Sequence, residues 1–324
     1  MPIQRNINLY FAPIQEYTDF VYRVAHSRTF GNIDKFFAPY LIRQNDGTIK
    51  KAHLRDIAPE NNSGYRLIPQ VMAGNTEDFL YLTKTLCNLG YEGINWNLGC
   101  PYSMVTNKEL GSGLLPFPDK IKEILSESLP KLSCRISVKL RTGLVSPDEI
   151  FNVIPVLNEF PLNEIILHPR IAKQLYRGNP DKDIFKQIAD ISKHPLVYNG
   201  DILTHNDFNQ LNELFGTTNS WMLGRGILMD PFLPAKIKQI PLPDKEKMVV
   251  LLKQFHSQIF YHYSKLLSGN SHLLMRMTKF WSYFCYSFPD PAKSFKRIKI
   301  AGSIANYNLA TKENFQRMID HEED

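Results

Sequence analysis

INWNLGCPYSMVTNKELGSGLL, residues 94–115, joins a short apolar strand to an abrupt loop and a glycine-rich step. Gly99 permits unusual backbone angles, while Pro101 fixes its own φ and lacks an N–H donor, so the strand ends here and leaves Cys100 on a loop. A lone cysteine is more often a small buried hydrophobe, and only its glycine and proline neighbours favour a catalytic thiol. Further on, Lys108 and the GSG run at 111–113 predict a loop of close backbone approach that feeds the next helix.

Outward from this stretch, short β-rich runs recur with helix-length patterns between them. Eight strands with intervening helices in about 230 residues predict a (β/α)8 TIM barrel. An open doubly wound sheet is the competing fold, weakened by the absence of a GxGxxG turn after the first strand. The expected strands are 8–12, 35–41, 66–71, 92–96, 135–140, 164–167, 196–198 and 220–223, and the expected helices are 19–28, 77–89, 119–129, 148–159, 181–191 and 206–215.

The composition changes after the barrel-like region. A proline-punctuated segment, IPLPD at 240–244, precedes four candidate helices at 245–267, 272–288, 292–300 and 307–319. We therefore expect two domains, a catalytic barrel over residues 1–240 and a small all-α domain over residues 241–324.

Charge is concentrated in one part of the chain. Residues 1–235 carry 24 basic and 24 acidic side chains, whereas residues 236–300 carry 12 basic and three acidic side chains. A basic block confined to one segment suggests a surface that faces a polyanion, and the alternative is a lysine-rich solvated helix face.

The bulk composition excludes several classes of protein. An apolar content of 43% and a charged content of 22% are those of a globular protein rather than a disordered one. The four cysteines are widely spaced and form no CxxC pair, which argues against a disulfide framework or a metal site. A polar start and the lack of a long apolar run predict no signal peptide and no membrane span. We expect a cytoplasmic monomer.

Residues able to do chemistry fall at the predicted carboxyl ends of the strands, which converge on one mouth in a barrel. Taken singly, Lys139 fits a barrel-edge ion pair and His168 a satisfied core histidine, but their shared position favours function. The loops after the seventh and eighth strands read NGD and GRG. Their glycines let backbone N–H groups approach an anion, and Arg225 can fork onto its oxygens, so we expect a phosphate-bearing cofactor there.

With these blocks assembled, the sequence resembles the tRNA-dihydrouridine synthase family, flavoenzymes with an FMN-binding barrel and a small helical C-terminal domain. NLGCPYSMVTNKELGSGLL is similar to the catalytic-cysteine signature of that family, and VKLRTG, HPRIAKQLYRG, YNGDI and MLGRGIL match further blocks in order. Two departures are Glu16, where the family has glycine, and the HPR at 168–170 in place of HGR. Ile14 also replaces a methionine.

The resemblance implies roles for individual residues. Cys100 corresponds to the proton donor. The residues expected to hold FMN are Pro13, Ile14, Gln70, Lys139, His168, Asn199, Gly200, Asp201, Gly224 and Arg225. The residues expected to contact the base or the RNA backbone are Asn97, Lys108, Arg170, Arg276, Lys279, Lys296, Arg297 and Lys299.

The implied reaction is reduction of the C5–C6 bond of a D-loop uridine in tRNA, with FMN as cofactor and NADPH as electron donor. The R-x-x-K-x-W pattern at 276–281 is more similar to the subgroup that acts on position 16 than to the one that acts on position 20. Two alternatives stay open. One is an FMN barrel that reduces a free pyrimidine or a small enone, and the other is a non-catalytic tRNA-binding protein that keeps a decayed barrel.

Overall fold

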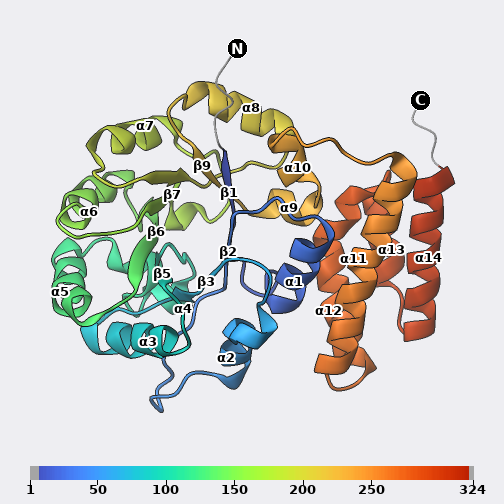
Figure 1. Ribbon diagram of the computed structural model, residues 1–324, viewed down its shortest axis with the longest axis horizontal. Helices are drawn as coiled ribbons and strands as arrows, with labels where there is room; N and C mark the ends of the chain where they lie inside the picture. Colours follow the sequence, from blue (N-terminus) through green and yellow to red (C-terminus); the bar gives the residue numbers. More distant parts are fainter. Residues whose placement is uncertain (1–6, 321–324) are drawn as a thin grey trace.

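Parallel strands dominate the first two thirds of the computed structural model, which describes residues 7–320 (Figure 1). Nine short strands form one sheet in the order β3-β2-β1-β9-β8-β7-β6-β5-β4, and every neighbouring pair is parallel. The strands are β1 (Asn8–Phe11), β2 (Lys35–Phe37), β3 (Leu67–Ile68), β4 (Gln70–Val71), β5 (Gly93–Leu98), β6 (Arg135–Gly143), β7 (Ile165–Ile171), β8 (Leu196–Tyr198) and β9 (Ser220–Leu223).

The sheet closes on itself at Pro69. β3 and β4 stand at the two ends of the strand order, yet only this one residue separates them along the chain. Pro69 has no N–H to give to the ladder, which divides one predicted strand into two. Its carbonyl still accepts from the backbone N–H of Asn95 at 3.0 Å, so the edge remains joined to β5. The eight predicted strands are thus present, and the TIM barrel is confirmed.

Helices surround this barrel, as the alternating sequence pattern predicts. Asp19, Asn75, Asp181 and Thr204 each cap a helix N-terminus by accepting from a backbone N–H with the side chain. The helices of the barrel region are α1 (Phe20–Thr29), α2 (Lys51–Ile57), α3 (Thr76–Asn88), α4 (Ser103–Thr106), α5 (Pro118–Ser128), α6 (Ile150–Leu157), α7 (Lys182–Ile191), α8 (His205–Leu214), α9 (Arg225–Met229) and α10 (Leu233–Ile237).

The inside of the barrel is filled by side chains, as in other barrels of this size. Tyr10, Phe37, Ile68, Ile166, Val197 and Met222 form a buried cluster of their own. At the amino ends of the strands, Glu164 accepts from the Tyr10 hydroxyl at 2.9 Å, and its two oxygens accept from Lys35 Nζ at 2.9 and 2.7 Å. This end of the barrel is closed by a buried, fully paired charge.

The C-terminal region is all helical, as predicted, and packs against α1 (Figure 1). Its helices are α11 (Lys245–Leu266), α12 (Asn270–Phe284), α13 (Pro291–Lys299) and α14 (Ile304–Asp320). Tyr22 on α1 makes an edge contact with Phe255 on α11, with ring centroids 5.3 Å apart, and it also contacts Phe280 on α12. The aromatic side chains of this segment therefore form core, which is what their helical spacing indicated.

Cys87, near the end of α3, and Cys134, just before β6, lie side by side with their Cα atoms 6.2 Å apart, although 47 residues separate them in sequence. Sequence separation says nothing about contact when the fold brings neighbouring strands and helices together.

Within residues 7–320, no helix is both long enough and apolar enough to span a bilayer.

Candidate functional site

A cavity of about 730 Å³ opens at the carboxyl ends of the strands. All ten residues expected to hold the cofactor line it, and so do Asn97, Cys100 and Lys279. Residues far apart in sequence thus meet at one mouth, because parallel barrel strands all end at the same face of the barrel. Lys279 reaches this mouth from α12. Lys108, Arg170, Arg276, Lys296, Arg297 and Lys299 are not among the lining residues.

The loop that carries Cys100 is held by hydrogen bonds at both sides. Asn97 Oδ1 accepts from the backbone N–H of Gly99 at 3.0 Å and of Cys100 at 2.9 Å. Ser112 donates its N–H and its hydroxyl to the Cys100 carbonyl at 3.1 and 2.8 Å. Gly111 has φ +57°, and a Cβ there would lie 2.8 Å from the Cys100 Cβ, so the close approach expected of the GSG run is present.

A row of amide side chains supports this loop from below. Asn97 Nδ2 donates to Gln70 Oε1 at 2.7 Å, and Gln70 Nε2 donates to Asn95 Oδ1 at 2.7 Å. Asn95 Nδ2 then donates to Ser137 Oγ at 2.8 Å. The row crosses three neighbouring strands, and Gln70 and Asn97 also line the cavity. Buried amides with every bond made hold one geometry, so the position of Cys100 is fixed by the barrel itself.

The thiol of Cys100 stays protonated in this environment. Burial raises its pKa above the ordinary value, and the nearby guanidinium of Arg141 lowers it by less than burial raises it. The Tyr40 hydroxyl lies 4.0 Å from Sγ, and burial raises the pKa of that hydroxyl as well. A neutral thiol is an acid rather than a nucleophile, so Cys100 is equipped to give a proton into the cavity.

Cationic side chains gather around the same cavity. Burial, with a smaller contribution from Arg141, lowers the pKa of Lys139 to about 7. Within the described residues Lys139 makes no hydrogen bond or ion pair. Burial also lowers the pKa of Arg141 to about 10, and its guanidinium donates to the carbonyls of Gly99 and Ile171 at 3.1 and 3.0 Å. Neither of these two cations is therefore paired with a carboxylate within the described residues.

His168 and Arg170 take different positions, which the sequence left open. Burial and then the surrounding cations lower the pKa of His168 well below its usual range, so the ring is neutral. Arg170 lies 3.2 Å from His168 Nε2 and can only donate, so Nε2 accepts and the ring proton is on Nδ1. The Arg170 guanidinium is buried against Asp201, which also accepts from Arg225 at 2.6 Å. Arg170 does not line the cavity, and its assignment to the substrate stays a prediction.

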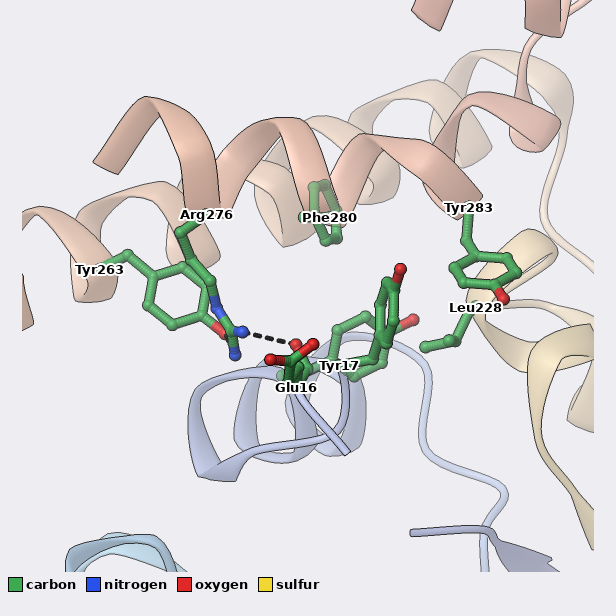
Figure 2. A pocket seen from close by; sticks show the side chains of 8 residues that line it. Glu16, Tyr17, Leu228, Tyr263, Arg276, Phe280 and Tyr283 are labelled. Atoms are coloured by element: carbon green, nitrogen blue, oxygen red, sulfur yellow. Dashed lines mark hydrogen bonds between the residues drawn. The ribbon is translucent and has the colours of Figure 1, made fainter. Parts of the chain in front are cut away.

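Residues 13–17 form another wall of the cavity. Glu16 and Tyr17 also line a second, much smaller pocket against the helical region (Figure 2). Glu16 has φ +68°, a left-handed conformation that favours glycine, which accounts for the glycine expected here from the resemblance. Its carboxylate is paired with Lys279 and its carbonyl accepts from Arg276, both on α12. Arg276 also pairs with Asp19, so this arginine joins the barrel to the helices instead of standing free for RNA.

The remaining basic candidates lie elsewhere on the surface. Lys108 is exposed after α4, and Lys296 and Lys299 are exposed on α13. Arg297 donates to Asn314 Oδ1 at 3.0 Å and is part of the packing between α13 and α14. The lining residues that the assignment of roles left out include five tyrosines and an arginine: Tyr17, Tyr40, Tyr102, Arg141, Tyr176 and Tyr283. Arg141 and Tyr176 stand inside the VKLRTG and HPRIAKQLYRG blocks, and those blocks were the signal that could have found them.

Comparison with known families identifies one match over nearly the whole chain. The model of the family described as dihydrouridine synthase (Dus) matches residues 10–319. A probable tRNA-dihydrouridine synthase of Staphylococcus aureus (strain N315) is 25% identical over 260 residues, covering 78% of this chain and 77% of that protein. A tRNA-dihydrouridine(16) synthase of Vibrio parahaemolyticus is 27% identical over 217 residues, or 65% of each chain.

One further relative and two solved structures complete the comparison. A tRNA-dihydrouridine(47) synthase [NAD(P)(+)]-like protein of Xenopus tropicalis is 30% identical over 200 residues, covering 60% of this chain and 31% of that protein. The old yellow enzyme homologue of Zymomonas mobilis is 10% identical with a TM-score of 0.53, covering 74% of this chain and 90% of that one. Morphinone reductase in complex with tetrahydroNAD is 12% identical with a TM-score of 0.50, covering 79% and 93%. At these identities the two structures show a shared barrel fold alone.

Proposed function

The chain belongs to the dihydrouridine synthase family, and on that premise we propose that it reduces the C5–C6 bond of a D-loop uridine in tRNA with FMN as cofactor and NADPH as electron donor. The enzymes of this family are flavin-dependent oxidoreductases. The observation that carries the proposal is the single cavity in which a buried, protonated Cys100 shares the walls with all ten predicted cofactor residues.

The donor set of this cavity fits a phosphate-bearing flavin. Lys139, Arg141 and Arg225 line the walls together with two carboxylates, Asp201, which is paired with Arg225, and Glu16, which is paired with Lys279. Lys139 has no partner within the described residues, and the pKa of His168 is lowered by burial and then by the cations around it. An anion bound at this wall would supply the missing negative charge.

In the proposed reaction the uracil ring gains a hydride at C6 and a proton at C5. A flavin bound in the cavity would supply the hydride. Cys100 holds the proton at Sγ until it is transferred. The bond from its N–H to Asn97 and the bond from the Ser112 hydroxyl to its carbonyl fix where that proton is presented. His168, neutral with its proton on Nδ1, is able to donate one hydrogen bond to a carbonyl oxygen or a phosphate.

A base inside folded tRNA must leave its stack to reach this mouth. The basic C-terminal helices support RNA as the substrate, because lysines that contact phosphates give affinity without regard to sequence. We assign Lys108, Lys296 and Lys299 to backbone contacts and Asn97 to the base, whereas Lys279 is held by its pair with Glu16. Position 16 is the proposed target, supported by the pattern at 276–281 and by the relative from Vibrio.

Purified protein tests this function in two steps. It should carry a flavin absorbance band that NADPH bleaches, and reduced protein should be reoxidised by unmodified tRNA but not by free uridine. Sequencing of dihydrouridine in tRNA from cells that lack the protein then identifies the position. Reoxidation by free pyrimidines or small enones, with tRNA inert, would favour the small-molecule reductase. A colourless protein that binds tRNA and takes up no FMN would favour the non-catalytic alternative.

A further inference from the structure

We propose that Glu16 is a positioning residue of the flavin site, through which α12 of the helical region sets the shape of the barrel mouth. The inference rests on the proposed function in that the ligand of the cavity is taken to be a flavin. It would make the C-terminal helices part of the cofactor site as well as of the RNA surface. The proposal stands on the backbone of Glu16, its two partners on α12 and its place in the cavity wall.

The backbone of Glu16 has a left-handed conformation, which is unfavourable for a residue other than glycine. A φ of +68° costs a non-glycine residue of order 1–2 kcal/mol, so the surrounding contacts must keep it there. The chain turns tightly around Glu16, because the backbone N–H groups of Tyr17 and Thr18 both donate to the Ile14 carbonyl at 3.0 Å. The left-handed residue therefore lies inside a compact turn, and five consecutive residues of that turn, 13–17, line the cavity.

The contacts that hold Glu16 come from α12. Lys279 is paired with its carboxylate. Arg276, one turn earlier on the same helix, donates to its carbonyl (Figure 2). Arg276 and Lys279 are three residues apart and therefore lie on the same face of α12, so this one face contacts both the side chain and the main chain of Glu16. Lys279 also lies 5.2 Å from the centre of the Tyr17 ring.

Neighbouring contacts fix the rest of the turn to the same helices. Tyr17 has its ring 5.0 Å from that of Tyr283, edge to face, and its hydroxyl lies 3.4 Å from Ser282 Oγ. Asp19 accepts from the Tyr263 hydroxyl at 2.8 and 2.9 Å and pairs with Arg276. Figure 2 shows Glu16 and Tyr17 lying against α12, between Arg276 and Tyr283.

Without the Lys279 pair, the turn would keep its other contacts with the helices but would populate less fully the conformation in which Ile14 and Glu16 face the cavity. Flavin binding would then have to restore that conformation, and its affinity would fall by the amount that this costs. The effect is separable from lost charge, because glycine at position 16 removes the carboxylate but accepts the positive φ without strain.

The test is a series of variants at position 16, with the dissociation constant for FMN measured by titration of apoprotein. Glu16→Gln keeps a hydrogen bond to Lys279 and should bind FMN like the wild type. Glu16→Ala should weaken binding about tenfold, since it keeps the strain and loses the partner. Glu16→Gly should fall between them. Hydrogen exchange at the amides of Tyr17 and Thr18 should accelerate in the order Gln, Gly, Ala.

A charge swap separates the pair from a general effect on folding. Lys279→Glu should weaken FMN binding, and adding Glu16→Lys should restore it. Lys122→Glu is the matched control, because it breaks a surface pair with Glu159 that is remote from the cavity, and it should leave the constant unchanged. Equal FMN affinity for Glu16→Ala and wild type, or no rescue by the double variant, overturns the proposal. If wild-type apoprotein itself takes up no FMN, the proposed function fails instead.

Discussion

Lys35 and Lys139 lie at opposite ends of the same barrel, and their surroundings differ. Lys35, at the start of β2, bonds to both oxygens of Glu164 and lies 4.4 Å from the centre of the Tyr10 ring. Lys139, on β6, lines the mouth, has no partner within the described residues and has its pKa lowered to about 7. The Lys35 ammonium thus has its bonding partners within the protein, whereas the Lys139 ammonium is available to a group that the chain does not supply.

This difference gives a physical criterion for telling a structural charge from a functional one. A buried ion pair whose partners are complete is expected to matter for folding, and breaking it leaves an uncompensated charge. A buried charge without a partner costs stability, so its presence has to be explained by what it binds. Substitutions at the two ends of the barrel test this division.

Cys100→Ala should have the largest effect and should act on chemistry alone. Loss of a positioned acid typically costs 10²–10⁴-fold in rate. Flavin reduction by NADPH should be nearly unchanged, while reoxidation by tRNA should slow by that factor. Stopped-flow absorbance measures each half-reaction separately. A wild-type rate of reoxidation by tRNA would remove Cys100 from its role.

The two lysines themselves can be compared by substitution with methionine. Lys35→Met leaves Glu164 buried without its cation and should lower the free energy of unfolding by about 3 kcal/mol. Lys139→Met removes an unpaired buried charge and should not destabilise the apoprotein, although it should impair flavin binding. Urea denaturation of the two variants beside the wild type is the measurement. Similar losses of stability for both would erase the contrast between the two ends.

Arg225→Ala should have a smaller effect, confined to the cofactor. One charge-assisted hydrogen bond is worth about 1.5–3 kcal/mol, which is roughly ten- to a hundredfold in affinity. The lower figure is expected, because Arg225 shares its charge with Asp201. Titration of apoprotein with FMN gives the constant, and an unaltered value would place the phosphate elsewhere in the mouth.

Proton linkage at Lys139 should appear as a pH dependence of stability that is spread over about three pH units. Its folded pKa of about 7 lies below the unfolded value of about 10.4, so between these pH values the unfolded chain binds more protons than the folded one. The stability of the apoprotein should therefore rise, relative to that of Lys139→Met, as the pH increases from about 7 to 10. Unfolding curves of both proteins across this range measure the difference. A parallel pH dependence would mean that the folded pKa of Lys139 is not depressed.

The repeating pattern of strands and helices was sufficient to predict the barrel, because each β-rich run and each amphipathic run forms its element locally. Pro69 is an instructive case, since it interrupts the backbone hydrogen bonding of one strand without changing the path of the chain. The short helices α2, α4, α9 and α10 were not predicted. They have four to seven residues, too few for a helical period to appear in the sequence.

The site was predictable where function depends on strand ends, and not where it depends on pairing across the fold. Cys100, Lys139 and His168 were placed correctly in one cavity, because a barrel assembles its strand ends whatever the loops do. Arg170 and Arg276 were assigned to substrate, yet their carboxylate partners are 31 and 257 residues away in sequence. The sequence around an arginine does not indicate a partner that lies so far away along the chain.

The amide row beneath Cys100 has a direction, and this direction limits how the site can change. From the Cys100 N–H through Asn97, Gln70 and Asn95 to Ser137, every group donates to the next and accepts from the one before. Ser137 completes the row by donating to the Ile94 carbonyl. Turning one amide over would set two donors or two acceptors face to face, so each member can reverse only if all of them do. The row therefore has a single orientation that the backbone dictates at both ends, and a carboxylate cannot replace any amide in it without leaving a neighbour's N–H or oxygen unmatched.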